Sequence, residues 1–194
     1  RAEGVLPHGV PGELALADLA GGIDAFLPLI ERAMEGRDMV RKDISIPVDG
    51  FTLTGTVESL GGTGILSFRY AKVTGSDLMR AWLSLLLLQA ANPGSQVTAL
   101  HIHRDGQARL SAVEEPLTAL KKLLDIYWQG LCRPVHFFPK SSYAYAESIR
   151  KYGNDGRAVQ DARKVWEGSR YQQGEAGDAA LLICFSGTDP LDDE

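Results

Sequence analysis

The feature that most constrains the fold is a run of alternating apolar and polar residues that two turn signals interrupt. The apolar members of "DISIPVDGFTLTGTVESL", residues 43–60, are Ile44, Ile46, Val48, Phe51, Leu53 and Val57. Alternation with a period of two is typical of β-strands, and Asp49-Gly50 between the two halves is typical of a tight hairpin turn. Gly61-Gly62 then leads into a third run, from about Gly64 to Lys72. The sequence therefore predicts a three-stranded antiparallel meander.

Helical and strand patterns follow along the rest of the chain. A helix is predicted over residues 23–36, with Pro28 in its first turns, and Ser76 is expected to cap a buried helix within "DLMRAWLSLLLLQAA". "QVTALHIHRDGQARLSAV" predicts a second hairpin around Asp105-Gly106. The remaining predictions are a helix from Pro116 to Gly130, an exposed loop over residues 151–157, a helix over residues 156–168 and a late buried strand over residues 179–187.

Length and composition favour one domain with a mixed fold. With 194 residues, 44% of them hydrophobic, the chain can bury one sizeable core, and we expect a single α/β or α+β domain over residues 1–194. Cys132 and Cys184 lie far apart without metal-ligand spacing, which predicts two reduced thiols in a cytoplasmic protein. The sequence has no signal peptide and no apolar run long enough to cross a bilayer. Because the chain begins at Arg1, we expect a piece of a longer polypeptide, although a processed chain would begin in the same way.

The charge is unevenly distributed along the chain. The formal net charge is −5, which argues against indiscriminate binding of phosphates. Residues 133–170 nevertheless carry a net charge of +4, whereas residues 171–194 carry −6. A basic block beside an acidic end is compatible with one surface that faces nucleic acid, although such blocks are more often ordinary solvated surfaces.

The meander has the layout on which metal-dependent DNA nucleases place carboxylates and a lysine. Such hydrolysis requires Mg²⁺ held by carboxylate oxygens of adjacent strands. Glu58 could be one ligand, but the next strand offers Arg69, Tyr70 and Ala71. If Gly61-Gly62 or the longer Gly61–Gly64 forms the turn, Glu58, Ser67 and Arg69 face the same side. Arg69 would then bring a fixed positive charge that can pair with Glu58 or a phosphate but cannot ligate a metal.

Other candidate sites carry weaker signals. His101 and His103 lie two apart on a predicted strand, a geometry compatible with a metal, but without an acidic or Cys partner at a telling spacing the favoured interpretation is two histidines on a solvent-facing strand. Cys132 with His136 permits a thiolate, but apolar neighbours around Cys132 favour an inert thiol. The chain has no P-loop and no dinucleotide-binding fingerprint.

The stretch "RPVHFFPKSSYAYAESIRK" is the best candidate for binding. Its aromatic and basic residues are Arg133, Phe137, Phe138, Lys140, Tyr143, Tyr145, Arg150 and Lys151. Proteins often hold single-stranded nucleic acid by pairing stacking surfaces with cations. We therefore predict DNA contacts among Arg133, Lys140, Tyr143, Arg150 and Lys151, while Phe137 and Phe138 could equally belong to the core.

The ordered set of segments resembles the C-terminal domain of RecC, the gamma chain of the RecBCD helicase–nuclease (exodeoxyribonuclease V). The similarity runs over nearly the whole chain, through "RAEGVLPHGVPGELAL", "DGFTLTGTVESL", "LMRAWLSLLLLQA", "YWQGLCRPVHFFPKSSYAYA", "ARKVWEG" and "GEAGDAALLICFSGTDPLDDE". The resemblance implies a restriction-endonuclease-like α/β core that is catalytically silent. Active relatives of that core have a histidine at the position of Glu13, an acid at Glu58, and a second acid and a lysine at Arg69 and Ala71. Two of these four positions cannot serve.

The resemblance also implies a role. RecC-like subunits hold RecB-like and RecD-like helicase and nuclease subunits, help to split duplex DNA ends, and take part in the recognition of the Chi sequence during repair and recombination. We accordingly expect a non-catalytic DNA-processing scaffold domain without a metal or other cofactor of its own, with Mg²⁺ and ATP in the partner subunits only. Two alternatives stay open: a module that only packs against other subunits, and an active nuclease with an altered metal site built from Glu13, Asp43 and Glu58.

Overall fold

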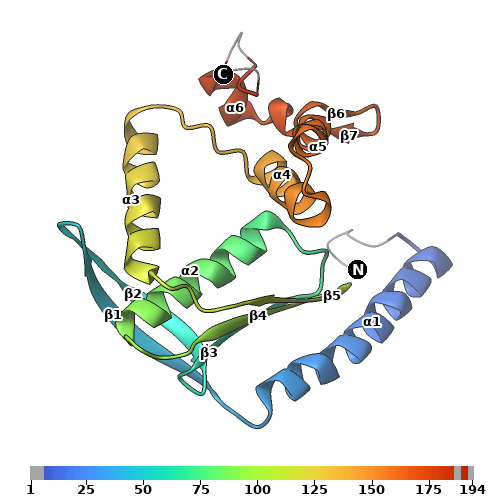
Figure 1. Cartoon of the computed structure of the whole chain (residues 1–194). Helices are drawn as coiled ribbons and strands as arrows, with labels where there is room; N and C mark the ends of the chain where they lie inside the picture. The colour runs from blue at the N-terminus through green and yellow to red at the C-terminus, as the bar shows by residue number, and fades with distance from the viewer. Residues whose placement is uncertain (1–6, 186–188, 192–194) are drawn as a thin grey trace. The chain divides into compact units, whose positions relative to one another are not determined.

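The computed structural model describes residues 7–185 and 189–191. Contacts divide the chain into two compact units (Figure 1). Unit 1 comprises Arg1–Val73 with Arg80–Pro116, and unit 2 comprises Thr74–Met79 with Leu117–Glu194. The expectation of one domain over residues 1–194 stays a prediction, and each unit is described by itself. Among the described helices, none is both long and apolar enough to span a bilayer.

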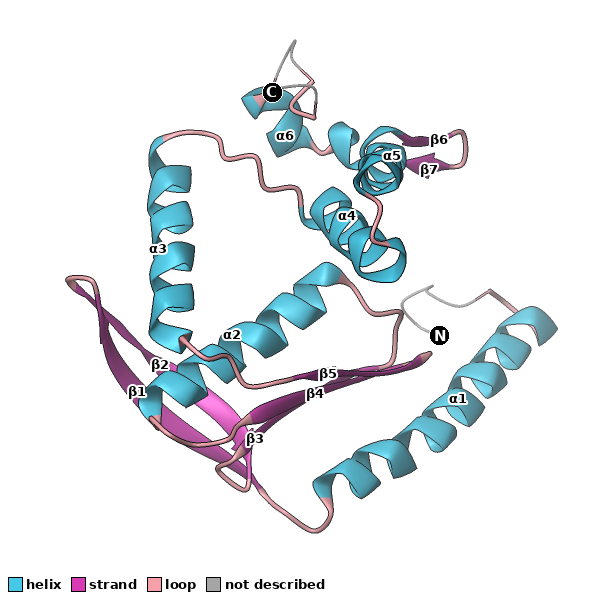
Figure 2. Ribbon diagram, in the orientation of Figure 1, coloured by secondary structure: helices cyan, strands magenta, loops and turns pink. Residues whose placement is uncertain are grey.

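Unit 1 contains a five-stranded mixed sheet with the strand order β1-β2-β3-β4-β5 (Figure 2). The strands are β1 (Met39–Val48), β2 (Phe51–Leu60), β3 (Gly64–Arg69), β4 (Thr98–His103) and β5 (Gly106–Leu110). The β3 and β4 strands are parallel, and the other neighbours are antiparallel. Both hairpins predicted from Asp-Gly turns are confirmed, because Val48 pairs with Phe51 and His103 pairs with Gly106. The predicted mixed α/β class is confirmed as well.

The third strand of the expected meander is joined to the second by a single pair. Only Leu60 and Gly64 are in register between β2 and β3, whereas β3 pairs along its whole length with β4. The turn is Gly61–Thr63, three residues long, because Leu60 pairs directly with Gly64. An odd number of turn residues reverses the alternation expected for a turn of two or four residues. This single pair does not fix the side on which Glu58 lies relative to Ser67 and Arg69, because β2 and β3 separate beyond it. Glu58 and Ser67 line one hollow, described below, and Arg69 is not among its lining residues.

The α1 helix (Val10–Met34) covers one face of the sheet. Phe26 and Ile30 of α1 pack in one core with Leu60, Leu66 and Ile102. The helix begins 13 residues before the predicted start at residue 23. Pro28 therefore lies in its interior rather than in its first turns, where its missing N–H leaves the carbonyl of residue 24 without the usual helical bond. The helix ends where Glu35 and Gly36 adopt positive φ angles of 49° and 73°.

The α2 helix (Gly75–Ala91) lies on the other face of the sheet and connects β3 to β4 (Figure 1). It is deeply buried as predicted, with Leu85, Leu86 and Leu88 fully excluded from solvent. The predicted cap, Ser76, is wrong. Thr74 accepts a hydrogen bond from the backbone N–H of Asp77, and the Asp77 carboxylate accepts one from the backbone N–H of Thr74. This reciprocal pair satisfies the first N–H groups of the helix.

Unit 2 is mostly helical. Its elements are α3 (Pro116–Cys132, in this unit from Leu117), α4 (Pro139–Tyr152), α5 (Asp155–Glu167), β6 (Gly168–Ser169), β7 (Gln172–Gln173), the short 3₁₀ helix η1 (Glu175–Gly177) and α6 (Ala179–Cys184). Its core joins three rings, with the centroid of Phe138 4.7 Å from that of Trp166 and 5.4 Å from that of Phe185. The helix predicted over residues 156–168 is confirmed as α5, and the helix predicted from Pro116 continues to Cys132, past Gly130.

Two predictions in unit 2 were wrong. The late strand is the α6 helix as far as Cys184, because the Asp178 carboxylate caps the N–H groups of Ala180 and Leu181 and the following residues favour helix. Residues 186 and 187 of that predicted strand lie outside the described residues. The expected loop over residues 151–157 is a two-residue connection, Gly153-Asn154. Gly153 ends α4 with a φ of 61°, and the Asn154 side chain caps α5.

Candidate functional site

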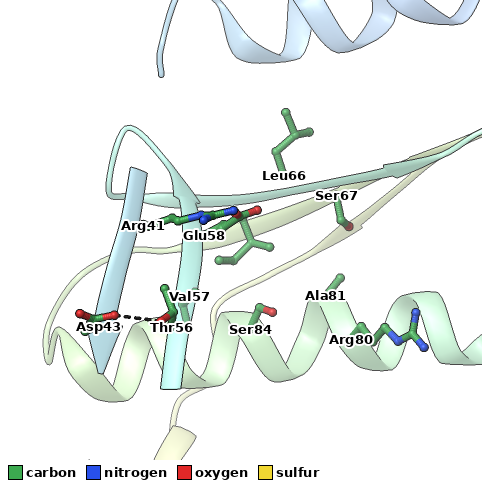
Figure 3. A pocket seen from close by; sticks show the side chains of 11 residues that line it. Arg41, Asp43, Thr56, Val57, Glu58, Leu66, Ser67, Arg80, Ala81 and Ser84 are labelled. Atoms are coloured by element: carbon green, nitrogen blue, oxygen red, sulfur yellow. Dashed lines mark hydrogen bonds and ion pairs between the residues drawn. The ribbon is translucent and has the colours of Figure 1, made fainter. Parts of the chain in front are cut away.

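An open hollow of about 680 Å³ lies in unit 1 between strands β1–β3 and helix α2 (Figure 3). Its lining mixes acidic, basic, hydroxyl and apolar side chains: Arg41, Asp43, Thr56, Val57, Glu58, Ile65, Leu66, Ser67, Arg80, Ala81 and Ser84. This hollow contains Glu58, the residue that the nuclease resemblance places at the first acidic ligand. Ser67 lines it too, because β2 and β3 separate after their single pair.

Within the hollow, the Glu58 carboxylate is engaged by an arginine. The two residues are directly opposite each other on β2 and β1, and Nε of Arg41 donates a hydrogen bond of 2.7 Å to Oε1 of Glu58 (Figure 3). A guanidinium has five N–H donors and no acceptor, so it neutralises the carboxylate but cannot bind a metal. The sequence reasoning missed Arg41, although the two-residue turn at Asp49-Gly50 already fixes the register that pairs residues 41 and 58.

The second carboxylate of the hollow is also engaged. Asp43 follows Arg41 on the same face of β1, and its Oδ1 accepts a hydrogen bond of 2.8 Å from Oγ1 of Thr56. Glu13 lies in the exposed first turn of α1 and is not among the residues that line the hollow. In the described part of the chain, no three His, Cys, Asp or Glu side chains are grouped as a metal site requires.

Arg69 and Ala71 lie at and just beyond the end of β3, away from the lining of the hollow. Nη2 of Arg69 donates a hydrogen bond of 3.0 Å to the carbonyl oxygen of Lys72. The backbone of Ala71 accepts a hydrogen bond from the N–H of Arg104. Neither side chain can supply an oxygen ligand to a metal or accept a proton from an attacking water.

The interpretation of His101 and His103 as two solvent-facing side chains was wrong. His101 is 3% exposed, and its Nδ1 lies 2.9 Å from Oγ of Ser67 on the parallel neighbour β3. The ring of His103 is half-buried and lies 6.1 Å from that of His101. No third Asp, Glu, Cys or His joins the pair among the described residues, so the two histidines do not form a metal site of three ligands there.

The basic-aromatic stretch folds mainly into α4. Lys140, Tyr143, Arg150 and Lys151 are spaced by three, seven and one residues, which places them on one face of this helix. Burial raises the pKa of Tyr143, and the nearby Glu147 carboxylate raises it further while Arg150 opposes the shift. This face of α4 therefore carries charges of both signs, because the Glu147 carboxylate lowers its net positive charge.

The N-terminus of α4 is already occupied by a carboxylate of the same unit. Glu175, 5% exposed, accepts hydrogen bonds from the N–H groups of Lys140 at 2.9 Å and Ser141 at 2.7 Å. It also accepts one of 2.7 Å from the Ser141 hydroxyl. Helix N-termini are common binding sites for phosphate, but here the anion is built into the fold. A DNA contact of α4 would therefore use its side chains rather than its first N–H groups.

The other residues of the stretch take different places. Arg133 lies just after α3, where its Nη2 donates a hydrogen bond of 3.0 Å to Oε1 of Gln129. Phe138 belongs to the core, Phe137 is half-exposed, and the Tyr145 hydroxyl bonds to Asp155. Both cysteines are free, as predicted, but Cys132 is exposed rather than surrounded by apolar groups. Of the five predicted DNA-binding residues, the structure thus brings together the four on α4.

The sheet and its two covering helices define a mixed α/β domain whose candidate site has two engaged carboxylates and, among the described residues, no cluster of three metal ligands. The family of RecC C-terminal domains matches residues 1–150, and the chain belongs to this family. A similar protein is the RecBCD enzyme subunit RecC of Mycolicibacterium smegmatis, 32% identical over 78% of this chain and 14% of that protein. The subunit of the same name from Escherichia coli K12 is 26% identical over 92% of this chain and 17% of its own length. The chain thus spans about a sixth of the length of these relatives.

Proposed function

We propose that this domain is a non-catalytic scaffold within a RecC-like subunit of an exodeoxyribonuclease V complex, acting in the repair of double-strand breaks and in recombination. Its relatives are named as subunits of the RecBCD enzyme. RecB-like and RecD-like subunits are the expected partners, and they would carry the Mg²⁺ and ATP chemistry. In this role the domain supports the splitting of the duplex and Chi-regulated resection without cutting DNA itself.

The observation that carries the proposal is the ion pair between Arg41 and Glu58. An active site of this layout needs its carboxylates free to bind a divalent cation. Glu58 instead faces a guanidinium at 2.7 Å, and the third strand supplies Arg69 and Ala71 where an acid and a lysine would be needed. A sheet with one long helix on each face is compatible with the restriction-endonuclease-like ancestry that the resemblance implies.

The direct test is a cleavage assay. The full-length subunit is incubated with linear duplex and single-stranded DNA and titrated with Mg²⁺ and Mn²⁺, in the absence of partner subunits. We expect no cleavage above that of a Glu58→Ala variant. Cleavage by the unmodified subunit that Glu58→Ala abolishes and the matched variant Glu114→Ala preserves would establish the altered-site nuclease instead.

A contact with DNA through the α4 face is the second part of the proposal. It is supported by the shared face of Lys140, Tyr143, Arg150 and Lys151 and by the net charge of +4 over residues 133–170. Binding of a forked duplex by the full-length subunit is measured at several salt concentrations. Because each phosphate contact contributes about 0.7–0.9 to the slope of log K against log salt, Lys140→Ala with Arg150→Ala should lower that slope by about 1.5.

The matched control for this test is Lys122→Ala with Arg170→Ala, which removes two exposed cations from other elements of unit 2. The control should leave the slope unchanged. If the α4 variant binds with the same affinity and slope as the unmodified subunit, these residues are not phosphate contacts. The role as a packing module alone, favoured by the exposed Tyr127, Trp128 and Leu131 of α3, would then stand.

A further inference from the structure

A groove lies on the face of the sheet opposite α2, entirely within unit 1. It has a volume of about 800 Å³ and runs between the C-terminal half of α1 and strands β3 to β5. Its floor is apolar: Leu60, Leu66 and Ile102 are already buried there in the core with α1, whereas Leu100 and Leu110 are partly exposed. Leu29 of α1 lines one wall and is 49% exposed. The helix therefore covers this face only in part, and an apolar surface remains open beside it.

The rim of the groove is positively charged. Arg32 lies in the last turn of α1, and Arg109 lies on β5 at the position paired with Leu100, so the two guanidinium groups come from opposite walls. Arg37 also lines the groove, but it pairs with Glu35 at 3.6 Å. Arg32 and Arg109 are exposed and form no ion pair or hydrogen bond with another described residue. Two uncompensated cations therefore flank a leucine-rich floor, in a chain whose formal net charge is −5.

The apolar floor and the basic rim together indicate which kind of molecule the groove can bind. A leucine floor favours apolar side chains, whereas a nucleic acid would need a row of cations and polar groups along its phosphates. The guanidinium groups on the two walls favour carboxylates, which they can bind through paired N–H donors. β5 is the last strand of the sheet in the described chain, so the wall it forms has no further strand beside it.

We propose that the groove binds an acidic segment of a partner polypeptide, one that inserts leucine-like side chains between Arg32 and Arg109. The proposal rests on the scaffold function proposed above, since it assigns to a specific surface one of the contacts that such a scaffold requires. Charge complementarity between the rim and the segment sets its orientation, and burial of the exposed parts of Leu29, Leu100 and Leu110 supplies most of its affinity.

The test places a photo-reactive p-benzoylphenylalanine at Gln107, an exposed residue of the groove lining, in the full-length subunit assembled with its partner subunits. After irradiation, mass spectrometry identifies the cross-linked peptide. We expect one segment of a partner subunit that combines Leu, Ile or Val with several Asp or Glu. The same probe at Ser45, an exposed residue of β1 that does not line the groove, should not capture this segment.

Charge reversal supplies the second measurement. Arg32→Glu with Arg109→Glu should reduce the yield of the Gln107 cross-link about tenfold, which two weakened rim ion pairs would produce. Lys122→Glu with Arg170→Glu should leave the yield unchanged. Circular dichroism and the recovery of assembled complex confirm that each variant folds and assembles.

Several results would overturn the proposal. They are a cross-link to DNA, to a second copy of the chain or to another part of the same polypeptide, the absence of any cross-link in assembled complex, and a yield that charge reversal does not change. Each would leave the cleavage and DNA-binding tests untouched, because those tests depend on Glu58 and α4. A result that refutes the groove proposal can therefore be distinguished from one that refutes the scaffold function.

Discussion

Glu58 and Glu175 are both acids with a defined partner, yet burial gives them different roles. The Arg41–Glu58 pair is exposed, with 78% and 52% of the two side chains accessible, and exposed ion pairs contribute at most about 1 kcal/mol to stability. Its importance is chemical, because it occupies the carboxylate that a metal would need. Glu175 is buried and accepts three hydrogen bonds from the start of α4. We therefore expect that replacing Glu175 lowers the free energy of unfolding.

Glu175→Ala should therefore destabilise the chain by about 2–3 kcal/mol, because it leaves the buried N–H and hydroxyl groups of Ser141 and the part-buried N–H of Lys140 without their acceptor. Urea unfolding followed by tryptophan fluorescence measures the change. Glu167→Ala is the control. Glu167 is exposed and faces Arg163 at 3.8 Å, and its loss should cost less than about 0.5 kcal/mol. Equal effects of the two substitutions would show that Glu175 is not a structural cap.

Asp161 links α5 to α4, and its hydrogen bonds predict how the stability of the fold depends on pH in acid. Hydrogen bonds from Lys164 at 3.0 Å and Ser148 at 2.9 Å lower the pKa of the Asp161 carboxyl below its ordinary value of 3.8. Because the folded-state pKa is the lower one, the stabilisation is present above the ordinary pKa and is lost as the pH falls through the folded value. An NMR titration should give a midpoint below 3.8 that rises in Lys164→Ala. A midpoint at or above 3.8 in the unmodified chain would refute this assignment.

At the scale of elements, local sequence patterns predicted where most strands and helices form, but they did not predict which strands pair. Asp49-Gly50 forms the two-residue turn that fixes the register of the first hairpin, whereas the second hairpin turns at Arg104-Asp105, one residue before the predicted Asp105-Gly106, and Gly106 already pairs with His103. The Gly61–Thr63 turn has no such fixed length, and β3 pairs with β4, a strand that lies beyond a 17-residue helix. The apolar run at residues 181–185 suits a strand or a helix equally, and the choice depends on the Asp178 cap.

The first turn of α2 packs against α4 through a glycine, within unit 2. A Cβ added at Gly75 would lie 2.8 Å from Cβ of Tyr143 and 3.2 Å from the carbonyl oxygen of Pro139. Gly75→Ala should therefore destabilise the chain by about 1–3 kcal/mol in urea unfolding, because the two helices must separate slightly. Gly156→Ala, at a site in α5 where the nearest atom would be 3.6 Å away, should be neutral or mildly stabilising. A neutral Gly75→Ala would mean that the two helices do not touch closely.

At the scale of the whole molecule, the sequence predicted the family, which the comparisons confirm, whereas the loss of catalytic chemistry stays a prediction. Glu58, Arg69 and Ala71 were found from the strand pattern and the resemblance. Arg41 could have been found from the hairpin register, because its partner lies directly across a turn of known length. Glu175 could not, since it lies 35 residues from Lys140 and only tertiary folding brings the two together. The groove between α1 and β5 could not be predicted from the sequence either, because its two walls are distant in the chain and only tertiary folding brings them together.

The central claim is that Arg41 takes the place of a divalent cation at Glu58, and metal binding tests it most directly. Mn²⁺ is titrated into the full-length subunit without its partner subunits, and electron paramagnetic resonance measures the free ion. We predict that the unmodified subunit and a Glu58→Ala variant bind the same amount of Mn²⁺ at millimolar concentrations. One additional bound ion in the unmodified subunit, lost in Glu58→Ala and retained in Glu114→Ala, would contradict the account.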